Sequence, residues 1–527
     1  MRRKLRLLAA GLVLALALAG WAAPGAAARA GAGQGVREAV ARDPTDGGVR
    51  PANFDNDPFD DLAIGAPGED IGAVADAGTV VTVYGGDSQA PGTYRQGAGG
   101  IAGAAERGDR FGAALAIGRF NDDPYSDVAV GVPGEDVGGA ADAGAVSILY
   151  GSERGMTGGP LLTESPPRAG AHFGAALTAA DFNNDRAVDL AVGAPEATVA
   201  GAAAAGRVTV LLNSNGPGQP HELGSGGVLV LRQGAGGMPG QAEAGDRFGA
   251  ALAAGDMVSG GSFSDDLAIG APGEDVGTAA DAGAVNLVER TDAGLRPGAL
   301  YLQGHPERGD RFGSSLTLNY FLADFGVDLA VGAPGETVNG VAGAGAVSLF
   351  DGNATAPGRE WLLYVDLGPN ATAPARPGDA FGASVGWYTA SPPYAGKTLV
   401  VGAPGRDRFG TDSGAVYACF FVPGQGVLVS QAQLQIGGET AEAGDRFGTS
   451  VTGGSPFTAD FNRFDGDAEE DVAVGAPGET VGGARGAGAA SIIYSYQYFQ
   501  HERLLWQGHA GIGGTPEPGD AFGAAVA

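Results

Sequence analysis

Short apolar runs of four to six residues recur along the chain, and each is bounded by Gly, Pro or Asp. Runs of this length are typical of strands, because helices usually continue for about ten residues or more. Hydrophobic residues make up 44% of the chain, which separates it from disordered sequences despite its 97 glycines. We therefore expect an all-β protein built from many short strands.

One longer pattern recurs around these runs. A Phe-Gly pair, preceded in most copies by Gly-Asp-x, leads into an Asp/Asn-rich stretch, a Gly-Ala-Pro element, a small-residue loop and an apolar tail. The interval of 62 to 77 residues fits one four-stranded blade of a β-propeller. The Phe-Gly pairs begin at Phe111, Phe173, Phe248, Phe312, Phe381, Phe447 and Phe522, and the Gly-Ala-Pro elements begin at Gly65, Gly131, Gly193, Gly270, Gly332, Gly402 and Gly475.

The two ends of the repeat series predict how the ring closes. The series begins with a Gly-Ala-Pro element that has no Phe-Gly before it, and it stops at a Phe-Gly that has no Gly-Ala-Pro after it. We therefore predict an all-β, seven-bladed propeller of four-stranded antiparallel blades, in which residues 522–526 complete the blade that begins at Asn53. A truncated eighth repeat is the alternative. Within the blades, we expect strands at residues 112–117, 127–131, 144–150 and 229–232.

The Asp/Asn-rich stretch has the spacing of a metal-binding loop. Oxygen side chains fall at positions 1, 3, 5 and 9, and a backbone carbonyl is available at position 7. Ca²⁺ binds about six to eight oxygen ligands, and this spacing wraps a tight loop around one ion. An Asx-rich turn without metal is the alternative. The predicted ligands are Asn53, Asp55, Asp57, Phe59 and Asp61 in the first loop, and Asp181, Asn183, Asp185, Ala187 and Asp189 in the third.

Two further loops keep part of this pattern but have an arginine at position 1, which is Arg119 in the second loop and Arg463 in the seventh. An arginine there could replace the cation by a salt bridge, so the sequence leaves calcium binding open and predicts two to four sites. The loops that end at Asp266 and Asp328 keep too few ligands. The candidate ligands are Asn121, Asp123 and Asp127 in the second loop, and Asp465, Asp467 and Asp471 in the seventh.

Taken together, the Phe-Gly pair, the acidic loop and the Gly-Ala-Pro element resemble the FG-GAP repeats of integrin α chains and their bacterial relatives. The resemblance covers roughly residues 50 to 527. It implies a seven-bladed propeller whose loops bind calcium on one face and whose other face meets partners. Residue by residue, it carries the metal role onto the first and third loops.

Charge and the N-terminus indicate where the protein works. The formal net charge of −29 repels phosphate backbones, so we expect no nucleic-acid partner. A basic start, an apolar run of signal-peptide length and an Ala-Ala-Ala stretch predict a secretory signal peptide over residues 1–28. A flexible segment over 29–49 and the propeller over 50–527 would follow. We expect a secreted monomer without a membrane span.

These features favour a calcium-binding module for extracellular binding or adhesion, with a protein or a glycan as partner. We expect no enzyme, because no H-E-x-x-H motif is present and the G-x-S-x-G spacing at residues 382–386 belongs to the repeat pattern rather than to a nucleophile elbow. An extracellular hydrolase or lyase with a carboxylate site near the propeller axis is the rival class, and a structural surface protein is a third. Two Arg-Gly-Asp tripeptides, at Arg107 and Arg308, are explained by drift of the repeat.

Overall fold

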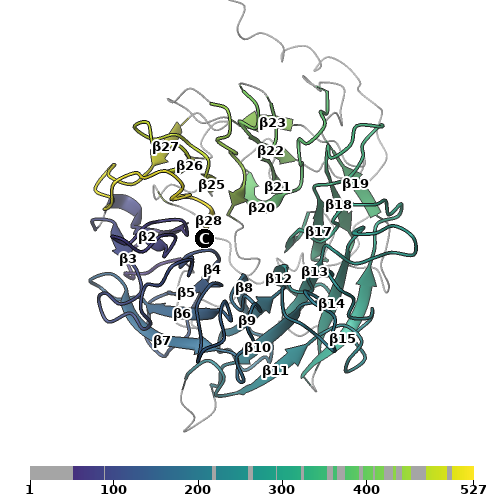
Figure 1. The fold of residues 1–527 in the computed structure, drawn as a ribbon, viewed down its shortest axis with the longest axis horizontal. Coiled ribbons are helices and arrows are strands. Elements are labelled where there is room, and N and C mark those ends of the chain that lie inside the picture. The colour runs from purple at the N-terminus through teal and green to yellow at the C-terminus, as the bar shows by residue number, and fades with distance from the viewer. Residues whose placement is uncertain are drawn as a thin grey trace, which may run out of the picture. The chain divides into compact units, whose positions relative to one another are not determined.

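The structure is a computed structural model (Figure 1). It describes residues 52–87, 89–215, 221–258, 265–291, 294–321, 326–352, 360–364, 374–390, 396–407, 410–419, 431–434, 442–452, 464, 471–494 and 501–527. The predicted signal peptide and flexible segment lie outside these residues, as do Asp465 and Asp467. Within the described part of the chain, no helix is long and apolar enough to cross a membrane.

The described strands form seven antiparallel sheets of four strands each, so the predicted seven-bladed propeller is confirmed (Figure 1). Blade 1 consists of β28 (Ala525–Val526), β1 (Leu62–Ala66), β2 (Thr79–Val83) and β3 (Gly92–Tyr94), with a short 3-10 turn, η1 (Gly85–Asp87), after β2. Blade 2 consists of β4 (Leu115–Gly118), β5 (Asp127–Val132), β6 (Ala145–Tyr150) and β7 (Thr157–Thr163), and blade 3 of β8 (Ala176–Ala180), β9 (Asp189–Ala194), β10 (Arg207–Leu212) and β11 (Gly227–Leu231).

The other four blades repeat this order. Blade 4 consists of β12 (Ala251–Gly255), β13 (Asp266–Ala271), β14 (Ala284–Thr291) and β15 (Gly294–Tyr301), and blade 5 of β16 (Ser315–Asn319), β17 (Asp328–Ala333), β18 (Ala346–Phe350) and β19 (Glu360–Leu363). Blade 6 consists of β20 (Ser384–Ala390), β21 (Gly396–Ala403), β22 (Ala415–Cys419) and β23 (Gln431–Leu434), and blade 7 of β24 (Ser450–Val451), β25 (Val472–Ala476), β26 (Ala489–Tyr494) and β27 (His501–Leu505).

Burial follows the position of a strand within its blade. Every residue of the second strands β5, β9, β13 and β17 is buried, because both faces of these strands pack against neighbouring blades. The fourth strand β11 alternates between half-buried and exposed residues, as expected for an outer strand with one face in water. The core is therefore a series of apolar layers between blades.

The two glycines of the repeat pattern meet at each blade interface. The Gly-Ala-Pro glycine of one blade faces the carbonyl oxygen of the Phe-Gly glycine of the next blade. A Cβ atom on Gly65 would lie 2.0 Å from the Gly112 oxygen, and one on Gly193 would lie 2.1 Å from the Gly249 oxygen. The same contact recurs around the whole ring, so only glycine lets the inner strands approach this closely.

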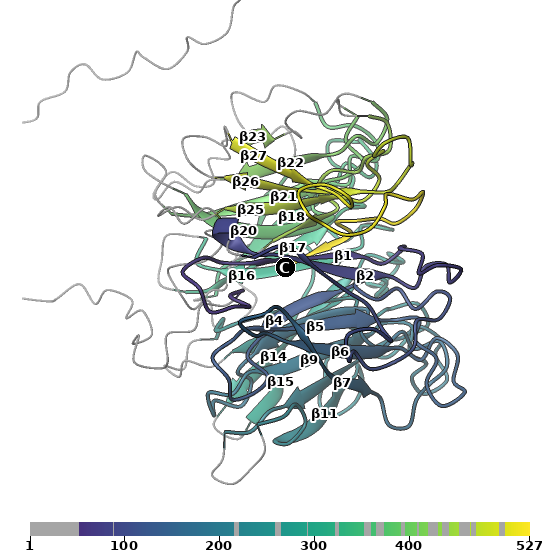
Figure 2. The same ribbon diagram turned by 90° about the vertical axis from the view of Figure 1, so that its left-hand side faces the viewer.

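Ring closure takes place in blade 1. Strand β28 pairs antiparallel with β1, with Ile64 opposite Val526 and Gly65 opposite Ala525. The C-terminus lies beside β28 in Figure 1 and beside β1 in the turned view of Figure 2. Residues near the C-terminus thus complete the first blade, as the ends of the repeat series predict.

The predicted strand boundaries were less accurate than the strand count. We expected first strands to begin directly after Phe-Gly, but β4 begins at Leu115 and β28 contains only Ala525 and Val526. The reason is the backbone at the glycine of the pair, which has φ of 93° at Gly112 and 84° at Gly523. This left-handed region makes a turn, so the strand starts a few residues later.

Candidate metal centre

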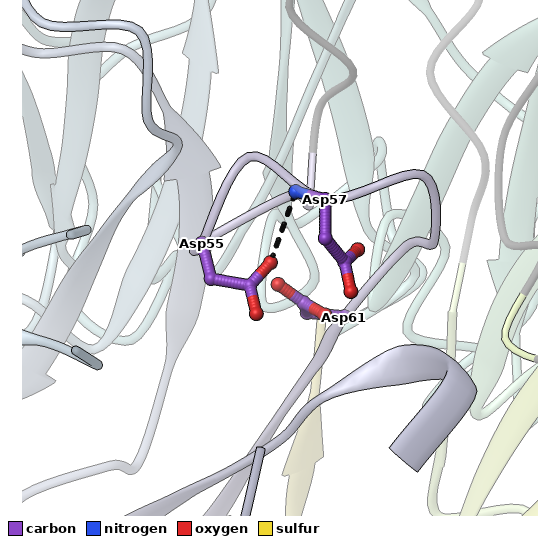
Figure 3. A group of neighbouring side chains, drawn as sticks. All are labelled: Asp55, Asp57 and Asp61. Atoms are coloured by element: carbon purple, nitrogen blue, oxygen red, sulfur yellow. Dashed lines mark hydrogen bonds between the residues drawn. The ribbon is translucent and has the colours of Figure 1, made fainter. Parts of the chain in front are cut away.

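The first Asp/Asn-rich loop lies directly before β1 and gathers three carboxylates. Ligand oxygens of Asp55, Asp57 and Asp61 all lie within 4.8 Å of one another, and the three side chains face one another in Figure 3. The dashed line in Figure 3 is the hydrogen bond from the Asp57 backbone N–H to Asp55 Oδ1, 3.2 Å long. The Phe59 N–H donates to Asp57 Oδ1 in the same way, over 2.8 Å. Successive Asx turns therefore hold the carboxylates in one loop.

Asp61, at position 9, connects this loop to the sheet. It is fully buried, and its two carboxylate oxygens accept hydrogen bonds from the backbone N–H groups of Phe54 (2.6 Å) and Gly85 (3.0 Å). Burial raises the pKa of Asp61 to about 8, and the nearby charges of Asp55 and Asp57 raise it further while the two N–H donors lower it. A cation at this loop would offset the same burial and repulsion.

Two oxygens of this loop fit a hard cation. Asn53 is 3% exposed, and its Nδ2 donates to the Asp57 carbonyl over 2.6 Å. Its Oδ1, like Asp57 Oδ2, is buried and has no hydrogen-bond partner in the described part of the structure. Buried oxygens are normally satisfied, and oxygen is the ligand that Ca²⁺ prefers. The residues present therefore fit calcium.

The third loop has the same ligand types in a different arrangement. Asp181 accepts backbone N–H groups on both carboxylate oxygens, from Asp185 (3.2 Å) and Arg186 (2.9 Å). Asp185 Oδ1 accepts the Ala187 N–H over 2.9 Å, and Asn183 Oδ1 accepts the Asp185 N–H, also over 2.9 Å. Among the described residues, three acidic side chains meet within 4.8 Å in the first loop and not in the third. The predicted ligands of the third loop therefore share one loop, and their carboxylates also accept N–H groups from Asn213 and Asn215 outside it.

In the second loop, Arg119 takes the place of Asn53. Its Nε and Nη2 both donate to the carbonyl of Asp123, over 3.1 and 2.5 Å. Asn121 and Asp123 lie in the same loop, where Asn121 Nδ2 donates to Asp123 Oδ2 over 2.8 Å. Asp127 accepts the N–H groups of Phe120 (2.7 Å) and Gly151 (3.0 Å).

The position-9 aspartate has a structural role that sequence reasoning missed. Asp328, in a loop with too few calcium ligands, accepts the Phe321 N–H over 2.8 Å and the Gly352 N–H over 3.4 Å. In the seventh loop, Asp471 accepts the Phe464 N–H over 3.0 Å. A feature of the sequence that could have revealed this role is a constant spacing of 24 residues between the aspartate and the residue whose N–H is its second donor. These donors are Gly85, Gly151, Asn213, Arg290 and Gly352.

Buried acid pairs lie at the opposite ends of the second strands. In one example, Asp310 accepts the Glu307 N–H over 2.5 Å, and Glu336 accepts from Gln303 Nε2 over 2.8 Å. Desolvation by burial raises the pKa of Glu336 to about 7, and the neighbouring Asp310 raises it further. The pKa of Asp310 is also raised by burial. The equivalent pairs are Asp109 with Glu135, Asp246 with Glu274, and Asp520 with Glu69, and in blade 7 the same two positions are the buried Asp445 and Glu479.

Two interfaces replace this acid pair with other chemistry. In blade 6, Arg406 stands at the glutamate position and forms a buried ion pair with Asp379. In blade 3, both positions are alanines, Ala171 and Ala197, and both are buried. At the acid-pair interfaces, Asp109 and Asp310 are also the aspartates of the two Arg-Gly-Asp tripeptides. They are 1% and 0% exposed, so these carboxylates are not presented as adhesion motifs.

Comparison with known proteins identifies one of the repeats, and the seven blades extend it to the whole ring. A family model described as the FG-GAP repeat matches residues 173–211, which run from the Phe-Gly pair of blade 3 into β10. The chain is an FG-GAP propeller. Integrin alpha-PS5 of Drosophila melanogaster is 40% identical to it over 98 residues, which are 17% of this chain and 9% of the integrin chain.

A second kind of relative carries an enzyme's name. The phosphatidylinositol-glycan-specific phospholipase D of Bos taurus is 34% identical to the FG-GAP propeller over 148 residues, which are 27% of this chain and 18% of that protein. The propeller thus spans less than a fifth of the length of these curated relatives. Among solved structures, a protein from Lactobacillus plantarum covers 88% of the propeller chain and 98% of its own, with 12% identity and a TM-score of 0.45.

The expectation that this chain is not an enzyme is contradicted by these relatives. Proteins of the same name from Rattus norvegicus and Homo sapiens match over the same length at 34% identity. The expectation depended on two hydrolase motifs, H-E-x-x-H, which the sequence lacks, and G-x-S-x-G, which occurs at residues 382–386 but with Ser384 in β20, where its Oγ donates to the Gly448 carbonyl over 2.8 Å. These motifs represent only two of the ways in which enzymes work. The lack of an active-site motif of this kind therefore does not exclude catalysis by an FG-GAP propeller.

Proposed function

We propose that this FG-GAP propeller is a secreted, monomeric, calcium-stabilised module that binds an extracellular protein or glycan. The first loop carries the proposal, since Asp55, Asp57 and Asp61 converge there and two buried oxygens, Asn53 Oδ1 and Asp57 Oδ2, accept no hydrogen bond within the described structure. Calcium would supply positive charge that offsets the repulsion of these carboxylates and would tie the loop to β1. The acidic surface, with a net charge of −29, supports a site for cations rather than for nucleic acid.

Thermal unfolding with and without calcium tests the metal part of this proposal. Extracellular calcium modules have dissociation constants of about 10⁻⁴ to 10⁻³ M. Calcium at about a hundred times the dissociation constant stabilises the folded state by about 2.7 kcal/mol per site. For a cooperative unit of this size, that free energy raises Tm by about 3 °C. An identical Tm in calcium and in chelator would contradict the proposal.

The Asp57→Asn variant locates the effect. It removes one charge and leaves the Asn53 contact to the Asp57 backbone in place. We expect the calcium-dependent rise in Tm to shrink while Tm in chelator stays near the wild-type value. An exposed carboxylate in blade 3, Glu222, provides the matched control, and Glu222→Gln should leave both values unchanged.

The relatives favour a second candidate, in which the propeller serves an enzyme that acts on phosphatidylinositol-glycan. The observation in its favour is the 148-residue match to proteins of that name. The test incubates the purified chain with vesicles that carry a protein anchored by this glycolipid. Release of the protein would support catalysis by the chain itself. Binding to the vesicles without release would support a substrate-binding role. If the chain neither releases the protein nor binds the vesicles, this candidate is rejected.

A further inference from the structure

The second loop keeps oxygen ligands at positions 3, 5 and 9 but has Arg119 at position 1. We propose that Arg119 is a built-in cation that replaces calcium in blade 2, so that this loop stays closed without metal. The inference rests on the proposed function in one respect, because it takes the first loop as the calcium-binding form of the same structure. It departs from the sequence-based possibility that Asn121, Asp123 and Asp127 bind calcium.

The contact made by Arg119 is the one that Asn53 makes in blade 1. In blade 1, Asn53 Nδ2 donates to the carbonyl at position 5, which belongs to Asp57. In blade 2, Arg119 donates to the equivalent carbonyl, of Asp123, through both Nε and Nη2. Position 1 therefore closes both loops by the same backbone contact. The difference is that Arg119 brings a permanent positive charge to it.

The side-chain oxygens at positions 3, 5 and 9 of the second loop all accept hydrogen bonds without an ion. Asp123 Oδ1 accepts the Tyr125 N–H over 3.0 Å, and its Oδ2 accepts from Asn121 Nδ2 over 2.8 Å. Asn121 Oδ1 accepts the Asp123 N–H over 3.0 Å, and both oxygens of Asp127 accept backbone N–H groups. The first loop differs, since two of its buried oxygens have no such partner in the described structure. At these three positions, the second loop thus offers no unsatisfied side-chain oxygen that would favour calcium.

The charges at the ligand positions also favour calcium in the first loop over the second. The ligand positions of the first loop carry three carboxylates, from Asp55, Asp57 and Asp61. Those of the second carry two, from Asp123 and Asp127, together with the guanidinium of Arg119. A divalent ion would gain less attraction in the second loop and would be repelled by the guanidinium. Arg119 therefore both removes the need for calcium and opposes its binding.

Calcium stoichiometry of Arg119→Asp tests the inference directly. This change restores a carboxylate at position 1, as Asp181 provides in the third loop. Titration of the full chain with calcium against a chromophoric chelator should give one more bound ion per chain than the wild type. Arg119→Asn, which copies position 1 of the first loop, is the second variant if Arg119→Asp does not fold by circular dichroism. Folded variants that bind the same number of ions as the wild type would overturn the inference.

Melting in chelator tests it independently of any calcium binding. Arg119→Ala removes the internal cation, so its Tm in chelator should fall below that of Arg154→Ala. Arg154 is an exposed arginine in the same blade and provides the same change of charge. Equal Tm values for the two variants would overturn the inference. If the wild type binds no calcium, the proposed calcium function fails, and this comparison still decides the role of Arg119.

Discussion

At the residue scale, the glycine pair at each blade interface sets the geometry of the ring. The Cβ position of every Gly-Ala-Pro glycine lies about 2 Å from a backbone carbonyl oxygen of the next blade, 2.1 Å in the case of Gly193 and Gly249. The atom that would be displaced belongs to the backbone of a closed ring and cannot move away like a flexible side chain. The two glycines therefore specify the distance between blades.

We predict that Gly193→Ala strongly destabilises the propeller. Overpacking in a dense interior costs about 1–3 kcal/mol, and the backbone partner here places this variant at the upper end. Gly201 serves as the control because it has φ of 94° and nothing within 4 Å of its Cβ position. Gly201→Ala should cost about 1 kcal/mol from backbone strain alone. Urea unfolding measures both, and equal losses would contradict a steric role for Gly193.

The repeat pattern predicted the number of blades but not the contact between glycines of neighbouring blades. Seven copies of Phe-Gly and Gly-Ala-Pro were enough to predict seven blades and the closing strand. That Gly193 faces Gly249 depends on the packing of consecutive blades, which spacing along one chain does not contain. The same limit applies to the loops, because Asn53 and Asp181 both suit position 1 by composition. Which oxygens remain unsatisfied is decided by the backbone conformation around them.

At the element scale, each acidic loop combines a metal-type turn with an aspartate that ties it to the sheet. The position-9 aspartate accepts backbone N–H groups both where the other ligands are present, as in the first loop, and where they are missing, as at Asp328. The metal-type turn and the hydrogen bonds of the position-9 aspartate can therefore occur independently of each other. These hydrogen bonds to the sheet explain why position 9 is still an aspartate in loops that lack the other calcium ligands.

We predict that Asp328→Ala lowers stability equally in calcium and in chelator. The change leaves the N–H groups of Phe321 and Gly352 without their carboxylate acceptor. The cost should be about 1–3 kcal/mol, the cost of one unsatisfied buried group, because the Phe321 N–H keeps the Asn319 carbonyl as a second acceptor at 3.1 Å. Asp57→Asn should instead reduce only the calcium-dependent part. Unfolding of both variants in the two conditions separates the roles, and a calcium-dependent loss for Asp328→Ala would contradict this assignment.

At the scale of the whole molecule, the buried acid pairs make the stability of the propeller depend on pH. Burial raises the pKa of Asp109, Asp246, Asp520 and Glu336 to about 7, from ordinary values of 3.8 for aspartate and 4.5 for glutamate. The folded state therefore favours the protonated forms. This contribution is fully present below the unfolded pKa values and is lost as pH rises through about 7.

We predict that the propeller is less stable at pH 8 than at pH 5, by on the order of 1 kcal/mol per acid pair. The groups around one such pair are Asp310, Glu336, Glu307 and the amide of Gln303. Glu336→Gln copies the protonated state, so its loss of stability between pH 5 and pH 8 should be smaller than that of the wild type. Urea unfolding in chelator measures this without interference from calcium. A loss as large as that of the wild type would contradict the prediction.

The pairing of β28 with β1 also means that blade 1 can be completed only late in synthesis. A ribosome adds about 5–20 residues per second. Val526 therefore emerges roughly half a minute to a minute and a half after Ile64, the residue opposite which it pairs. During that time the inner edge of blade 1 lacks its partner strand, and open edges recruit other chains. Until residues 525–526 have been made, the inner edge of β1 is therefore a place where a newly made chain can pair with another chain.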